Sequence, residues 1–266
     1  MSDAATNYDP HRFRTTVPFY ARYRLGYPDS LIARVASETG LRAGDTVLDL
    51  GCGPGTLSVP FARLGMNVLA VDPEPEMLAA AAGAASDSGV EVEFRHGSSF
   101  DLPPDIGPFR LVSMGRAFHW MDRAATLAAL DKRVVPGGAI ALFDDEHPRT
   151  VENAWRRTLE EIGRRYGRAA EPHIRAREGG TYRTHESHLL GSAFNDLVRI
   201  SVIVRRTLAA DDIVGLAYSL STSAPQKLGE RRTAFEADLR AALAGLSPNG
   251  RFTEIAEMGA LIARRS

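Results

Sequence analysis

Three glycines alternate with other residues directly after an apolar run early in the chain. Residues 47–50 read Val-Leu-Asp-Leu, and Gly51, Gly53 and Gly55 follow at every second position. Glycine has no Cβ, so a loop of this kind can bring bare backbone against a ligand. A second acid, Asp72, ends the next apolar run, where a carboxylate can accept hydrogen bonds from both ribose hydroxyls of an adenosine. The pattern predicts a site for an adenosine-type cofactor.

The glycine spacing differs from the dinucleotide fingerprint Gly-x-Gly-x-x-Gly, because Thr56 stands where the last glycine would fall. A nucleotide-dependent oxidoreductase is therefore less favoured, although it stays an alternative. The single cysteine of the chain, Cys52, lies inside the loop and excludes an intramolecular disulfide. Most buried cysteines are inert, so this position favours a small packing residue over a nucleophile.

Several motifs together resemble those of the class I S-adenosylmethionine-dependent methyltransferases. They are the loop at 47–55, Asp72 and the Pro-Gly-Gly of 136–138. Residues 20–28 (Tyr-Ala-Arg-Tyr-Arg-Leu-Gly-Tyr-Pro) and 116–120 (Arg-Ala-Phe-His-Trp) are similar to a small-molecule subgroup of that family. The resemblance extends over most of the chain. It implies that S-adenosyl-L-methionine is the cofactor and that its methyl group passes to an O, N or C atom of a small organic metabolite.

The resemblance also implies which residues hold the cofactor. Asp49 and the backbone of the glycine loop contact its methionine end, while Tyr20 and Arg24 cover it and bind its carboxylate. Residues 98–100 occupy the usual adenine-binding stretch, although many relatives have an aspartate where this chain has serine. Arg116 serves either the same carboxylate or the substrate. The predicted cofactor contacts are Tyr20, Arg24, Asp49, Gly51, Cys52, Gly53, Asp72, Pro73, Met77, Ser98, Ser99, Phe100, Gly115 and Arg116.

Two residues are predicted to act in catalysis, His119 and Glu146. Methyl transfer from a sulfonium requires in-line approach of the acceptor, so alignment supplies much of the acceleration. A base is needed only if the acceptor loses a proton, and histidine has an ordinary pKa of about 6.5. Glu146 belongs to a polar cluster, residues 144–147, at the end of a predicted strand. Alternatively, the trio 118–120 only walls the pocket and the acids cap the next segment.

The predicted elements alternate in type along the first half of the chain. Strands are expected at 46–50, 67–71, 90–95, 109–114 and 139–143, with helices between them. Such alternation predicts an α/β fold with a parallel sheet covered on both faces. A half-exposed strand at 198–204 and a last strand near 255–263 complete the count, and the resemblance places the last strand antiparallel between the fifth and sixth. We therefore expect a doubly wound, Rossmann-like, seven-stranded sheet.

Four parts are predicted along the chain. Residues 1–28 form a cofactor-covering segment, 29–148 the S-adenosylmethionine-binding core, 149–195 a helical lid inserted before strand six, and 196–266 the end of the core sheet. Apolar residues at helical spacing between 151 and 166 predict the long amphipathic helix of that lid. In an open parallel sheet, ligands bind beyond the carboxyl ends of the strands, where the predicted site residues gather.

Composition limits the remaining function classes. With 266 residues, 44% of them hydrophobic, and a net charge of −1, the chain resembles an ordinary soluble protein with a substantial core. Near-neutral charge disfavours nucleic acid as a partner. No apolar run of about eighteen residues and no export signal occur, so we expect no membrane partner and a cytoplasmic location. No metal is expected, because contiguous acids on a short loop cannot all face one ion. A monomer, a homodimer and a non-catalytic cofactor-binding protein all stay open.

Overall fold

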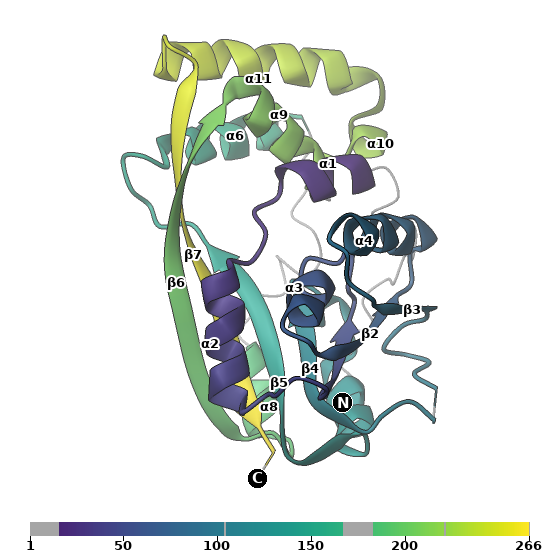
Figure 1. Ribbon diagram of the computed structural model, residues 1–266. Coiled ribbons are helices and arrows are strands. Elements are labelled where there is room, and N and C mark those ends of the chain that lie inside the picture. Colours follow the sequence, from purple (N-terminus) through teal and green to yellow (C-terminus); the bar gives the residue numbers. More distant parts are fainter. Residues whose placement is uncertain (1–15, 104, 167–182, 221, 266) are drawn as a thin grey trace.

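The sheet lies at the centre of the molecule. A computed structural model describes residues 16–103, 105–166, 183–220 and 222–265, and its seven strands follow the order β3-β2-β1-β4-β5-β7-β6 (Figure 1). Strands β1 to β5 run parallel, while β7 runs antiparallel to both β5 and β6. The predicted fold class is therefore confirmed. The strands are β1 (Thr46–Leu50), β2 (Asn67–Asp72), β3 (Glu93–His96), β4 (Phe109–Gly115), β5 (Val134–Glu146), β6 (Asp196–Ala209) and β7 (Arg251–Arg264).

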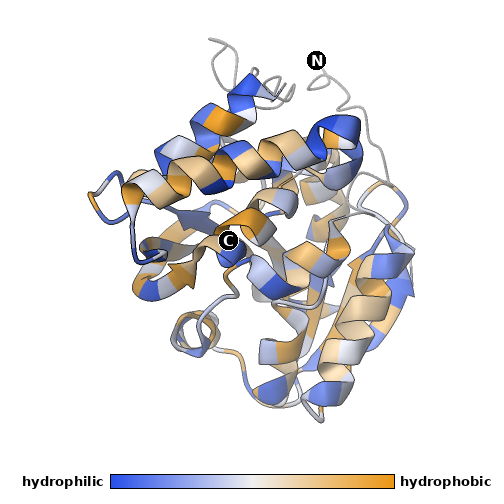
Figure 2. Cartoon of the chain, turned by 90° about the horizontal axis from the view of Figure 1, so that it is seen from above, coloured by the Kyte–Doolittle hydropathy of each residue, from blue (hydrophilic) through white to orange (hydrophobic). Residues whose placement is uncertain are grey.

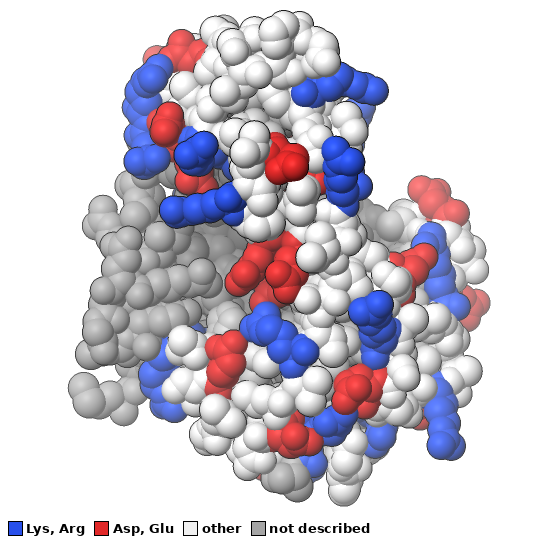
Figure 3. Space-filling view, turned by 90° about the vertical axis from the view of Figure 1, so that its left-hand side faces the viewer, with Lys and Arg blue, Asp and Glu red and all other residues white. Residues whose placement is uncertain are grey.

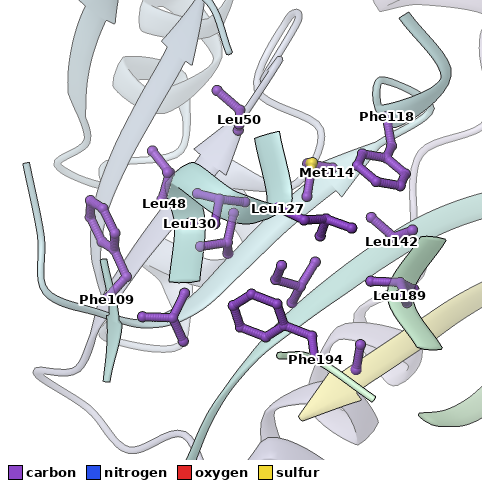
Figure 4. Packing of buried hydrophobic residues seen from close by; sticks show 14 of the residues in the cluster. Leu48, Leu50, Phe109, Met114, Phe118, Leu127, Leu130, Leu142, Leu189 and Phe194 are labelled. Carbon is purple, nitrogen blue, oxygen red and sulfur yellow. The ribbon is translucent and has the colours of Figure 1, made fainter. Parts of the chain in front are cut away.

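Helices cover both faces of the sheet, as the uninterrupted apolar strands require. One face packs on α5 and α8, where Leu127, Leu189 and Phe194 join β1, β4 and β5 in one apolar cluster (Figure 4). The other face packs on α2 and α3 through Leu31 and Phe61. The helices are α1 (Val17–Tyr23), α2 (Asp29–Thr39), α3 (Ser58–Arg63), α4 (Pro75–Asp87), α5 (Arg123–Asp131), α6 (Ala154–Arg165), α8 (His185–Leu190), α9 (Ala210–Tyr218), α10 (Pro225–Leu228) and α11 (Arg232–Leu246), with 3-10 turns η1 (Phe118–Trp120) and η2 (Gly229–Arg231).

A helical cap, formed by α6, α9, α10 and α11, stands above the carboxyl ends of the strands (Figure 1). Its interior is apolar, with Trp155, Phe235 and Leu239 almost fully buried. Seen from above, its helices carry both hydrophilic and hydrophobic residues, as amphipathic helices do (Figure 2). Residues 251–256 of β7 pair only with β6 and extend past the end of β5 into the cap. Trp155 Nε1 donates to the Thr253 carbonyl at 2.8 Å and anchors α6 to this extension.

The segment predicted as a lid, residues 149–195, contributes two described helices that pack in different places. Helix α6 joins the cap through the cluster it shares with α9 and α11, whereas α8 packs below it on the sheet. Part of the predicted insertion, 167–182, lies outside the described residues. The cap is thus built from α6 together with helices that follow β6.

Local differences from the predicted elements have simple causes. Strand β5 begins at Val134 rather than 139, because the chain through Pro136 and Gly137 stays in the strand with a register shift against β4. Strand β3 begins later than predicted, at Glu93, opposite Leu69 of β2. Pro60 lies in the first turn of α3, where its missing N–H costs no helical hydrogen bond. Within the described ranges, no helix has the length and apolar character needed to cross a membrane.

Candidate cofactor and active site

The glycine loop leaves β1 with a backbone that favours glycine. Gly51, Gly53 and Gly55 have φ values of 72°, 53° and 81°, in the left-handed region. The amides of Gly51 and Cys52 donate to the Val71 carbonyl at 2.8 and 3.1 Å, which ties the loop to β2. A Cβ on Gly51 would lie 2.7 Å from Ala117 Cβ, whereas one on Gly53 would meet nothing within 4 Å. The open side of the loop is therefore at Gly53.

Asp72 faces this open position from the end of β2. Its carboxylate accepts from the Gly53 amide at 2.8 Å and from the Glu74 amide at 2.9 Å, and only 7% of the residue is exposed. Burial raises the pKa of Asp72, although both amides oppose this shift. A carboxylate accepts about four hydrogen bonds, so two remain for further donors. These sites suit the two hydroxyls of a ribose.

Asp49 lies below the loop and is almost fully buried. Its two oxygens accept from the hydroxyls of Ser58 at 2.5 Å and Ser113 at 3.2 Å. Burial raises the pKa of Asp49 to about 6, in spite of these hydrogen bonds. Burial also raises the pKa of the Cys52 thiol well above its usual range, which fits a packing residue better than a nucleophile.

The predicted adenine-binding stretch follows β3 as a tight turn. Asp101, which sequence reasoning missed, accepts from the Ser98 amide at 2.8 Å and the Ser98 hydroxyl at 2.5 Å. In the sequence, the sign of this turn was an aspartate three residues after a serine in a predicted loop, a spacing typical of turns that a side chain stabilises. Phe100 is 52% exposed. The remaining predicted contacts here are half-buried Ser99 and Pro73, before α4, and buried Met77 in the first turn of α4.

Arg116 lies directly after β4 with an unusual backbone. Its φ of 55° is the one positive value recorded for a non-glycine residue in the described chain. The guanidinium pairs with Asp145 of β5, donates to the Leu25 carbonyl at 2.9 Å and lies 4.8 Å from the Tyr27 ring centre. Although burial opposes it, this guanidinium holds the pKa of Asp145 below its usual range. A Cβ on preceding Gly115 would lie 3.2 Å from the same Tyr27 ring.

Tyr20 and Arg24 belong to the segment that joins the sheet to the cap. Arg24 donates to the Ser219 hydroxyl at 3.0 Å and the Ser219 carbonyl at 3.2 Å, directly after α9. Its guanidinium lies 4.8 Å from the Tyr20 ring centre. No ion pair joins Arg24 to a carboxylate of the described chain. Helix α1 also lies beside α4 (Figure 1), so both predicted residues are near the cofactor loops. The positive charge of Arg24 is not neutralised by an ion pair with a described carboxylate.

A chain of charged side chains, which the sequence did not reveal, connects this site to the cap. His147 lies 3.4 Å from Asp145 through Nδ1 and 3.2 Å from Glu254 of β7 through Nε2. Glu254 also pairs with Arg156 of α6 and Arg206 of β6, and only 1% of its side chain is exposed. Burial alone would raise the pKa of Glu254, but these partners lower it to about 2. Its sequence signal was an acid at an inward position of β7, between buried Phe252 and Ala256.

The two predicted catalytic residues lie in different settings. His119 is half-buried in η1, with its ring centre 4.6 Å from that of Trp120. Glu146 is exposed at the end of β5, opposite Glu257 of β7. Neighbouring strand residues face opposite sides, so Glu146 faces away from the side on which Asp145 meets Arg116. The structure does not bring Glu146 to that pair, and both catalytic roles stay predictions. Nowhere in the described ranges do three or more His, Cys, Asp or Glu side chains gather into a group that could hold a metal ion.

The sheet order and the acid-closed glycine loop resemble those of S-adenosylmethionine-dependent methyltransferases. Comparisons with known proteins point to the same class. Residues 47–138 match the family model described as a methyltransferase domain. The similarity to the Ala-Phe-His-Trp subgroup stays a prediction.

Two sequence relatives and one structure illustrate the similarity. An uncharacterized methyltransferase of Mycobacterium tuberculosis (strain H37Rv) is 31% identical over 160 residues, 60% of each chain. A ubiquinone biosynthesis O-methyltransferase of Xanthomonas axonopodis pv. citri is 40% identical over 102 residues, 38% of this chain and 43% of the relative. The chain therefore aligns with about half of the length of these relatives. The crystal structure of an S-adenosylmethionine-dependent methyltransferase from Thiobacillus denitrificans with S-adenosyl-L-homocysteine shares the fold, with a TM-score of 0.54, 17% identity, and 97% and 99% of the two chains covered.

Proposed function

We propose that this protein is an S-adenosyl-L-methionine-dependent methyltransferase that acts on an O, N or C atom of a small organic metabolite. One observation carries the proposal. Gly53 presents bare backbone to open space, and the Asp72 carboxylate that fixes it keeps acceptor capacity for a ribose. In a protein that bound no nucleoside, this geometry would leave a buried carboxylate with unused lone pairs, which is costly.

Each part of the site has a role in this function. The bound cofactor supplies an electrophilic methyl group on a sulfonium. Asp72 holds the ribose, the 98–100 turn flanks the adenine, and buried Asp49 lies on the side of the cationic methionine end. Arg24, unpaired with any carboxylate among the described residues, is our candidate for binding the cofactor carboxylate. His119 is the candidate base where the acceptor must lose a proton. We propose that the predicted cofactor-covering segment, 1–28, of which residues 16–28 are described, and α6 exclude water.

Calorimetric titration tests the cofactor assignment. We expect S-adenosylmethionine and S-adenosylhomocysteine to bind and NAD to give no heat. Asp72→Asn should weaken both adenosyl ligands at least about tenfold, because it removes a charged acceptor from the ribose. Asp87→Asn, an exposed carboxylate at the end of the neighbouring helix α4, is the matched control. Tight NAD binding with no response to the adenosyl ligands would show an oxidoreductase instead.

Turnover needs a separate assay, because a cofactor-binding protein need not be an enzyme. A radiolabelled methyl donor offered with a panel of small phenols, amines and carboxylic acids reports transfer to any acceptor atom. We expect labelled product from at least one class and loss of product with Asp72→Asn. Adenosyl binding with no transfer across the panel would favour the non-catalytic binder.

A further inference from the structure

A cavity of about 620 Å³ opens between the segment after β5 and helix α6. Four of its lining side chains are arginines, Arg149, Arg156, Arg157 and Arg164, while two are acidic, Glu160 and Glu161. The face toward the left of Figure 1, drawn in Figure 3, carries Lys and Arg side chains, with some acids among them, over its upper left part, above a central group of acids. The cavity volume falls within the range of small-molecule sites, about 300–1,000 Å³.

The positive charges in this cavity are poorly neutralised. Among the described residues, Arg156 is the one arginine of the four with a carboxylate partner, and it shares that partner, Glu254, with Arg206. Arg156 Nε is buried and has no hydrogen-bond acceptor. Arg164 Nε reaches only the backbone carbonyl of Glu160, at 3.4 Å. A buried guanidinium N–H without an acceptor is costly, so the arrangement favours an added acceptor.

The cavity also adjoins the proposed active site. His147 lines it and lies 3.4 Å from Asp145, the partner of Arg116 at the end of β4. The residues directly after β5 therefore line the cavity, and His147 connects it to the Asp145–Arg116 pair at the ends of β4 and β5.

We propose that the cavity binds the oxyanion, a carboxylate or a phosphate, of an anionic methyl acceptor. This inference rests on the proposed function and adds the chemical class of its substrate. Guanidinium groups suit the task because their planar donors match carboxylate and phosphate oxygens two at a time. Arg149 and Arg157, which form no ion pair with a described residue, supply the outer charge, and Arg156 supplies the inner, partly buried donor.

Three ligands that share one ring test the proposal: benzoate, phenyl phosphate and uncharged benzamide. They are titrated by calorimetry into protein saturated with S-adenosylhomocysteine. We expect both anions to bind in competition with each other and to weaken with added salt, and benzamide to bind at least about tenfold more weakly than benzoate. The anion that binds with the higher affinity shows whether phosphate or carboxylate is the preferred group.

Matched variants locate the binding. The double variant Arg149→Gln/Arg157→Gln should weaken both anions at least about tenfold and leave S-adenosylhomocysteine affinity unchanged. Arg165→Gln removes the same kind of charge from α6 outside the cavity lining, where Arg165 faces Asp238 at 3.1 Å, and should change neither. Equal affinity for benzoate and benzamide, or unchanged anion binding in the double variant, would overturn the inference.

The experiment also separates this inference from the proposed function. S-adenosylhomocysteine is titrated first, and its failure to bind contradicts the methyltransferase assignment and, with it, the role of the anion as a methyl acceptor, while the oxyanion site itself is tested by the anion titrations. The anion titrations need no turnover, so they are equally decisive on cofactor-free protein. Cofactor binding without any anion binding at millimolar concentration would refute only the anionic acceptor.

Discussion

The most direct test of the charged chain is removal of its central carboxylate by Glu254→Gln. The folded-state pKa of Glu254 is about 2, against an ordinary value of 4.5. Since a tenfold change in proton affinity is worth about 1.4 kcal/mol, this difference corresponds to about 3 kcal/mol of stability at neutral pH. The lowered pKa means that this contribution is complete above pH 4.5 and is lost as the pH falls toward 2. Glutamine keeps the shape but leaves Arg156 and Arg206 without their shared carboxylate.

Urea denaturation of the wild type and the variant at pH 7 and about pH 3 measures this effect. The variant should lose about 3 kcal/mol of unfolding free energy at pH 7 and less than half of that at pH 3. At pH 3 the Glu254 carboxyl is mostly protonated in the unfolded state, so folding must remove that proton and the ionised carboxylate contributes less. Glu257→Gln, three positions along β7 and in no ion pair with a described residue, is the control. A loss below about 1 kcal/mol, or one independent of pH, would refute the buried, charge-balanced role of Glu254.

Three further predictions address the loop and the cap. The pKa of Asp49 is raised from 3.8 to about 6, so the protein loses about 3 kcal/mol of folding stability as the pH rises from about 4 through 6. Asp49→Asn should remove this decline in denaturation curves between about pH 4 and 7. Gly53→Ala should cost about 1 kcal/mol through its positive φ and place a methyl group in the cofactor space, which calorimetry with S-adenosylhomocysteine would show as weaker binding with the fold retained. Gly215→Ala should destabilise the protein in spite of the higher helix propensity of alanine, because the new Cβ overlaps the Tyr23 ring where α1 packs on α9. A melting temperature equal to or above that of the wild type would contradict that packing.

The central strands were predictable because each is an apolar run that ends in a loop of Gly, Pro or acid. The first strand was predicted with its observed bounds, Thr46–Leu50. The outer strands were predicted too short, at 198–204 and 255–263, against Asp196–Ala209 and Arg251–Arg264. Their outer arms leave the core sheet and support the cap, so their sequences alternate with charged residues such as Arg206 and Glu254. A single chain does not show which helices such arms will meet.

The candidate site also has some contacts that the sequence predicts and others that it does not. The loop after β1 and Asp72 are close in sequence, and their contact follows from neighbouring parallel strands, so spacing alone predicts it. The link from His147 to Glu254 depends on the antiparallel register between β5 and β7, residues about a hundred positions apart, and no local pattern encodes that register. The same register turns Asp145 inward and Glu146 outward, a distinction that four contiguous polar residues do not reveal.

The cap and its junction with the sheet are stabilised by different interactions. Within the cap, Trp155, Phe235 and Leu239 are buried among apolar side chains, and such burial tolerates changes of pH and salt. At the junction, the charged chain from Arg116 to Glu254 joins cap and sheet through groups whose attraction requires ionised carboxylates. Buried ion pairs contribute little net stability compared with apolar packing, but they are specific in geometry, because an unpaired member is strongly disfavoured. Hydrophobic packing therefore holds the cap together, while the charged chain fixes where the cap stands over the strand ends at which methyl transfer is proposed.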